Sequence, residues 1–145
     1  MNHLARSLSA LLVILAAPVA MAACSSDDDA SSTTEVVVAG APLSISGPLI
    51  VAGSDGEVIV GTLENVTDRT IEVTSAQSSA GAAEFRSADG SLLASVKIEP
   101  DSELELTADG VHIALVDATD DDSVDVVLGL DIQDNFSFTA LRSAE

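Results

Sequence analysis

The segment from Ile98 to Leu115 reads Ile-Glu-Pro-Asp-Ser-Glu-Leu-Glu-Leu-Thr-Ala-Asp-Gly-Val-His-Ile-Ala-Leu, and its residues alternate between apolar and polar. Over 103–106 glutamate alternates with leucine, which is typical of a strand with one face in the core and one in water. Over 111–115 the odd positions are apolar, so His112 and Ala114 share the opposite face. An Asp-Gly pair between the two runs indicates a turn. The segment therefore predicts two half-buried β-strands.

Short alternating or β-branched runs of the same kind lie on both sides of this segment. Together they give nine candidate strands: Leu43–Val51, Glu57–Leu63, Thr70–Ser75, Ala83–Ser87, Leu92–Ile98, Glu103–Thr107, Val111–Val116, Val124–Leu130 and Phe136–Leu141. Turn residues separate them, and beyond the first 23 residues no window keeps a helical period. Phe136 and Phe138 lie two apart on the last strand and are predicted core residues. Short strands without helices predict an all-β sandwich or barrel.

The beginning of the chain has the features of an export signal. The run from Leu8 to Ala23 is apolar except for one serine, and it is too short for a bilayer span of about 20 residues. It ends in Met21-Ala22-Ala23-Cys24, which resembles a bacterial lipobox, in which the cysteine is lipidated and becomes the new N-terminus. The alternative is an ordinary secretory signal cut near Ala23, which would leave Cys24 as a free thiol.

This boundary divides the chain into three parts. Residues 1–23 are the predicted lipoprotein signal peptide, and residues 24–40 are the lipid-anchored cysteine followed by a flexible tether rich in Ser and Asp. Residues 41–142 are the predicted β-sandwich domain. We therefore expect a protein on the extracytoplasmic face of a bacterial membrane, held there by Cys24.

The charge of the chain excludes several functions. It has 24 Asp and Glu against 5 Lys and Arg, a formal net charge of −19. Phosphates would be repelled, so we expect no nucleic-acid binding. An anionic membrane surface would also repel the domain, which favours an outward-facing module on its tether. Because the sequence has one cysteine, an intrachain disulfide or a multi-cysteine zinc site is excluded.

Two further chemistries have candidate residues in the sequence, a Ser–His–Asp triad and a calcium-binding loop. A Ser–His–Asp triad would need His112, which lies inside a predicted strand and follows no nucleophile elbow, so we expect no enzyme. The acidic loop Asp117–Asp125 offers oxygen ligands for Ca²⁺ but lacks the glycine and terminal glutamate of an EF-hand. It is interpreted as a solvated turn between strands, with weak divalent-ion association as the alternative.

Several segments together resemble the periplasmic copper chaperone family PCu(A)C. Ile98–Leu115 is similar to the stretch that leads into the copper-binding strand of that family, and Leu63–Ile71 looks like its strand–Asn–turn–strand entry. Ala83–Arg86 resembles its Val-Glu-Leu-His segment, and the last two predicted strands match its last two strands. The resemblance covers residues 41–142. It implies a cupredoxin-like β-sandwich of about eight or nine short strands and a role in copper handling.

The resemblance also implies a Cu(I) site of two histidines and two methionines, of which this chain keeps little. His112 matches the histidine of the final His-x-Met pair, and Ala114 stands where the methionine would be. Arg86 stands at the upstream histidine position, and the upstream methionine would fall near Gly90–Leu93, where none exists. His112 is thus the single surviving ligand position, with either weak adventitious metal binding or a structural role.

Two functions remain open from the sequence. The first is a lipid-anchored extracytoplasmic protein with the copper-handling role of the family but without most of its Cu(I) ligands. The second is a β-sandwich lipoprotein that binds no metal and acts as a protein-interaction module. The expected partners are the membrane, through Cys24, and an extracytoplasmic protein. No cofactor is expected beyond the copper that the resemblance implies.

Overall fold

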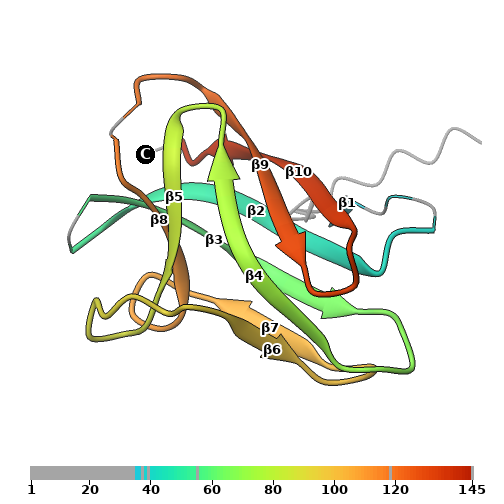
Figure 1. The fold of residues 1–145 in the computed structure, drawn as a ribbon. Helices are drawn as coiled ribbons and strands as arrows, with labels where there is room; N and C mark the ends of the chain where they lie inside the picture. Colours follow the sequence, from blue (N-terminus) through green and yellow to red (C-terminus); the bar gives the residue numbers. More distant parts are fainter. Residues whose placement is uncertain (1–34, 37, 39, 55, 118, 145) are drawn as a thin grey trace, which may run out of the picture. The chain divides into compact units, whose positions relative to one another are not determined.

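A computed structural model describes residues 35–144 except 37, 39, 55 and 118. The predicted signal peptide, Cys24 and most of the predicted tether lie outside these residues. All the regular elements among the described residues are β-strands (Figure 1). In the same part of the chain, no helix is long and apolar enough to span a bilayer.

The described residues form ten strands, and each of the nine predicted strands has a counterpart among them. They are β1 (Glu35–Val36), β2 (Leu43–Gly53), β3 (Gly56–Asn65), β4 (Ile71–Ser78), β5 (Gly81–Arg86), β6 (Val96–Ile98), β7 (Glu103–Leu106), β8 (His112–Leu115), β9 (Ser123–Leu130) and β10 (Asn135–Arg142). The additional strand, β1, falls within the predicted tether and pairs with β2. The prediction of an all-β fold is confirmed.

Seven of the strands close into a ring. Their order is β2, β10, β9, β4, β5, β8 and β3, and β3 pairs back to β2. The pairs are antiparallel except β10–β2, where Leu141 and Arg142 lie opposite Leu49 and Ile50. In Figure 1, β4, β5 and β9 cross over β2 and β3, which gives the two layers of the predicted sandwich. The short strands β1, β6 and β7 extend this ring by pairing with β2, β4 and β3.

The inside of the ring is a continuous apolar core built from alternate residues of each strand. Ile71 and Val73 of β4 are completely buried, and Ile113 of β8 packs in the same cluster. Phe136 and Phe138 are 1% and 4% exposed, with ring centroids 5.9 Å apart, so their prediction as core residues is confirmed. Burial of these side chains is the main source of stability, at about 1.5–3 kcal/mol for each large residue.

One predicted strand is wrong in its first half: Leu92–Ile98 is a strand only over Val96–Ile98. After β5 the chain makes a turn in which the Ser87 and Ser91 main chains are hydrogen-bonded. Leu92 then meets β5 through a single bridge, opposite Arg86, and remains 65% exposed. The apolar run misleads because β5 and β6 pair with different parts of β4, at residues 76–78 and 71–73, and the chain between them has no continuous partner strand.

Asn65 holds one end of the ring together. It ends β3 with its side chain completely buried. Its amide nitrogen donates to the carbonyl oxygens of Arg69, Ile98 and Glu99 at 2.7, 2.9 and 3.1 Å. Its amide oxygen accepts from the N–H and the hydroxyl of Thr67 at 3.0 and 2.7 Å. One side chain therefore satisfies the main chain of the turn before β4 and of the segment after β6.

We predict that Asn65→Ala lowers the free energy of unfolding by about 2–3 kcal/mol, because it leaves buried carbonyl groups without donors. Asn135→Ala is the control, since Asn135 is exposed at the start of β10, and it should cost less than about 0.5 kcal/mol. Urea unfolding of the two variants measures both values. A cost for Asn65→Ala no larger than that of the control would contradict the role given to this side chain.

Candidate functional site

The outer face of the β5–β8 pair carries the residues that the sequence marks for metal chemistry. Arg86 lies directly opposite His112, and Glu84 lies directly opposite Ala114. The residues between them point inward and are buried in the core, as Phe85 and Ile113 illustrate. The alternation in the sequence therefore predicts the faces correctly. Arg86, Glu84, His112 and Ala114 share one outward patch, which we call the β5–β8 patch.

His112 is buried, with 8% of its surface exposed. Its Nδ1 lies 3.0 Å from the carbonyl oxygen of Gly110. Because a carbonyl only accepts hydrogen bonds, this contact assigns the proton of the neutral ring to Nδ1 and leaves the lone pair on Nε2. The turn before β8 therefore fixes the orientation of the imidazole. Nε2 is therefore the one nitrogen that His112 can offer to a metal ion.

Arg86 brings a fixed positive charge to the same patch. Its Nη2 lies 3.0 Å from Oε2 of Glu84, and its Nη1 donates to the carbonyl oxygen of Gly90 at 3.3 Å. Its Nε is buried without a hydrogen-bond partner. Guanidinium has no lone pair to offer a metal, and its charge repels a cation at the neighbouring strand. Arg86 therefore makes the surroundings of His112 unfavourable for Cu(I).

The turn after β5 occupies the region where the resemblance places an upstream methionine. Asp89 accepts hydrogen bonds from the hydroxyl of Ser87 and the N–H of Ser91, and these bonds lower the pKa of its carboxyl group. The side chain of Leu92 points into solvent, and Ala114 offers only a methyl group. Within the described residues, no group of three or more His, Cys, Asp or Glu side chains is placed to hold a metal ion. The residues present do not fit the two-histidine, two-methionine site.

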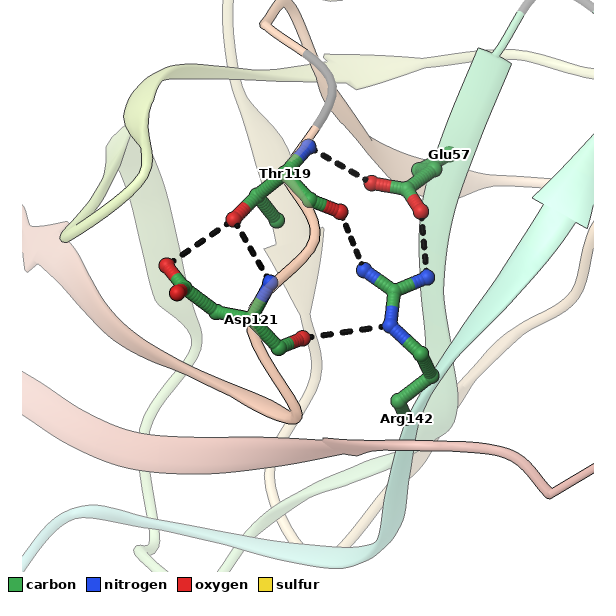
Figure 2. A network of polar contacts seen from close by, with 4 residues as sticks. All are labelled: Glu57, Thr119, Asp121 and Arg142. Atoms are coloured by element: carbon green, nitrogen blue, oxygen red, sulfur yellow. Dashed lines mark hydrogen bonds and ion pairs between the residues drawn. The ribbon is translucent and has the colours of Figure 1, made fainter.

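A second polar cluster lies at the end of the ring where β3 begins and β10 ends, and it involves the acidic loop (Figure 2). Arg142 ends β10 and forms an ion pair with Glu57 near the start of β3. The Arg142 guanidinium also donates to the carbonyl oxygens of Thr119 and Asp121, the latter at 3.1 Å. The Thr119 N–H donates to the other Glu57 oxygen at 3.1 Å. Arg142 and Glu57 thus hold the main chain of the loop.

The carboxylates of the acidic loop take no part in holding the loop to Arg142 and Glu57. Asp120, Asp121 and Asp122 are exposed, and the Asp121 carboxylate accepts a hydrogen bond from the Thr119 hydroxyl within the loop. The interpretation as a charged turn between strands fits this geometry, but the loop is more firmly held than the sequence predicts. Sequence reasoning missed Arg142 and Glu57, although both stand at inward positions of their strands, where an unpaired charge is costly.

Solved structures with the same fold are known, although neither sequence comparison finds a relative. No protein-family model matches the sequence, and no curated protein matches it significantly. The copper-bound PCuAC domain from PmoF2 aligns with a TM-score of 0.63 at 18% identity, covering 77% of this chain and 99% of that domain. The apo PCuAC domain from PmoF1 gives 0.63 at 20%, covering 77% and 100%. The chain therefore has the PCuAC-like, cupredoxin-like fold that its sequence predicts.

We predict that Glu57 makes stability depend on acidity in a defined range. Hydrogen bonds from the Arg142 guanidinium and from the Thr119 N–H lower the pKa of Glu57 below its ordinary 4.5. A carboxylate with a lowered folded-state pKa stabilises the protein above its unfolded-state pKa, and this contribution is lost as the pH falls through the folded-state value. Glu57→Gln should therefore be less stable than wild type at neutral pH, and the difference should shrink below pH 4.5.

Urea unfolding between neutral and acidic pH measures this difference. Asp68→Asn is the matched control, because Asp68 is exposed in the turn after β3 and should give a small difference at every pH. A gap between wild type and Glu57→Gln that stays constant below pH 4.5 would show that the Glu57 carboxylate is not what Arg142 stabilises.

Proposed function

We propose that this chain is a lipid-anchored extracytoplasmic protein with a non-catalytic role in copper handling, and that it does not bind Cu(I) at the four-ligand position of its fold. The fold shared with PCuAC domains, one of them copper-bound, supports the copper-handling role. The direct pairing of Arg86 with His112 is the observation that supports the lack of Cu(I) binding. A guanidinium that is tied to Glu84 lies across from the remaining imidazole.

Physical chemistry favours this assignment over a working Cu(I) site. Cu(I) prefers soft thioether and thiolate ligands together with imidazole, and the β5–β8 patch offers one imidazole and no sulfur. Restoring a site would also require displacement of the Arg86–Glu84 ion pair, which is 33% and 36% exposed. The remaining nitrogen, Nε2 of His112, gives at most weak binding. A copper-related role would then run through contact with another protein.

The second candidate is a protein-interaction module with no connection to copper. The observation in its favour is that the outer face of the ring carries exposed apolar residues on neighbouring strands, Leu49 and Leu141 among them. Both candidates place the active surface on the outside of the ring, and both are non-catalytic. Cu(I) titration of a variant with restored ligands tests whether the β5–β8 patch can hold a metal ion. The result does not depend on which of the two candidate functions is correct.

We predict that the wild-type chain does not compete with a Cu(I) chelator at affinities tighter than about micromolar, because one imidazole replaces four ligands. The double variant Arg86→His, Ala114→Met should bind at least about tenfold more tightly, since it restores two ligand types on one face. Arg86→Lys, Ala114→Leu is the control for changes in size and packing. Chelator competition followed by absorbance measures all three.

Two results would overturn the proposal for the β5–β8 patch. Stoichiometric wild-type binding tighter than about micromolar that His112→Ala abolishes would show a working site. Equal binding by the double variant and its Lys/Leu control, both folded by circular dichroism, would show that these positions do not belong to the ligand set.

Lipid anchoring has a separate test. We expect protein recovered from bacterial membranes to begin at Cys24 and to carry a diacylglyceryl group on its sulfur, because the residues before it resemble a lipobox. Mass spectrometry of the N-terminal peptide measures the adduct, and Cys24→Ser is the control that should lack it. Unmodified wild-type protein in the soluble fraction would favour cleavage as an ordinary secretory signal.

A further inference from the structure

An apolar stripe crosses the outer face of the ring where β10, β2 and β3 lie side by side. Leu141 lies opposite Leu49, and Leu49 lies opposite Val60, so the three side chains project from the same face. Leu141 is 50% exposed, Leu49 is 37% exposed and Val60 is half-buried. The neighbouring inward residues Ile50 and Ala140 already belong to the core. The outer stripe, defined as Leu49, Val60 and Leu141, is therefore surplus to the packing of the ring.

A groove of about 440 Å³ opens beside the outer stripe. Val51 and Val60 line it from β2 and β3, and residues 106–108 line it from the end of β7. It lies where the register of β2 shifts between Ser46 and Leu49. The bulge depends on Gly61, whose φ is +148° and where a Cβ would lie 3.0 Å from the Ser46 carbonyl oxygen. Such bulges are features that the sequence specifies, and this one hollows the outer face.

Carboxylates stand at both ends of the outer stripe. At one end, the Arg142 N–H donates to the Asp122 carbonyl oxygen at 2.8 Å, which brings the exposed residues 120–122 next to Leu141. At the other end, Glu105 lines the groove, and four residues beyond Val60 along β3, Glu64 lies directly opposite Glu103. Two like charges at opposed positions destabilise a strand pair, and a cationic partner would relieve this repulsion.

The positive charges of the described residues are mostly used elsewhere. Lys97 lies 3.9 Å from Glu72 on the β6–β4 pair, and Arg86 and Arg142 form the ion pairs described above. A second copy of this chain would bring the same acidic groups to the stripe, and its formal charge of −19 makes self-association unfavourable. Anionic lipid is disfavoured for the same reason. The surface therefore complements a partner that combines an apolar face with flanking positive charges.

We propose that the outer stripe and its groove bind a basic amphipathic segment of another protein, whose apolar side chains cover Leu49, Val60 and Leu141 and whose Lys or Arg side chains face the flanking carboxylates. A helix fits the spacing, because successive turns repeat at about 5.4 Å and neighbouring strands lie about 4.8 Å apart. The surface lies on β10, β2 and β3, whereas the β5–β8 patch lies on other strands. The proposal therefore holds independently of the copper role.

The test uses two synthetic amphipathic peptides with the same leucine face, one with Lys and one with Glu on the polar face. The full chain is titrated into each fluorescently labelled peptide, and anisotropy measures binding. We expect the Lys peptide to bind and the Glu peptide not to bind. Leu49→Ser, Leu141→Ser should weaken binding of the Lys peptide at least about tenfold, which corresponds to about 1.4 kcal/mol of lost apolar contact.

Val127→Ser is the matched control, because Val127 is an outward residue of β9 with the same 37% exposure as Leu49 but lies outside the stripe. It should leave binding of the Lys peptide unchanged. Equal binding of both peptides, or Lys-peptide binding that survives the double serine variant, would overturn the proposal, the latter by showing attraction through charge alone. Sedimentation velocity adds a third outcome: self-association that the double variant abolishes would make a second copy the occupant and would also overturn it.

Discussion

The seven strands form a closed ring because β10 pairs in parallel with β2. Without it, the seven strands would form an open sheet with two long free edges, which invite pairing with other chains. With it, Leu141 and Arg142 lie opposite Leu49 and Ile50, and the inside of the ring becomes a sealed apolar core. The closure is short, because β10 meets β2 only at Leu141 and Arg142. Because the inside is filled, the outer face and the two ends are left for specific chemistry.

Each end of the ring is closed by a polar side chain that serves the main chain. Asn65 supplies a buried amide to the turns at one end, and Arg142 together with Glu57 fastens the acidic loop at the other. The physical reason is shared: where strands stop pairing, carbonyl and N–H groups lose their partners, and buried unpaired groups are expensive. At the Asn65 end, where the side chain is fully buried, an uncharged amide supplies the hydrogen bonds. At the Arg142 end the side chains are partly exposed, so an ion pair is tolerated.

Local alternation predicted most of the fold, because most inward residues of the ring are apolar and the alternation along each strand shows which face is inside. The predicted strand at Leu92 is wrong in its first half because strand formation there depends on a partner strand, which the nearby sequence does not reveal. The same limit applies to Glu57 and Arg142, which are 85 positions apart and meet through the closure of the ring. The contacts of Asn65 with Ile98 and Glu99 are also long-range, so the nearby sequence does not reveal them.

Arg86 and His112 lie side by side because the register of β5 and β8 places them opposite each other. Their register is set by Phe85 and Ile113, which lie opposite each other in the core, so the two outward side chains face each other whatever they are. Replacing Arg86, which is 33% exposed, costs little stability because it changes neither the core nor the ladder of hydrogen bonds, whereas His112 is buried and hydrogen-bonded to Gly110. Identification of copper binding has to come from the side chains present, and here these are one imidazole, one guanidinium and a methyl group.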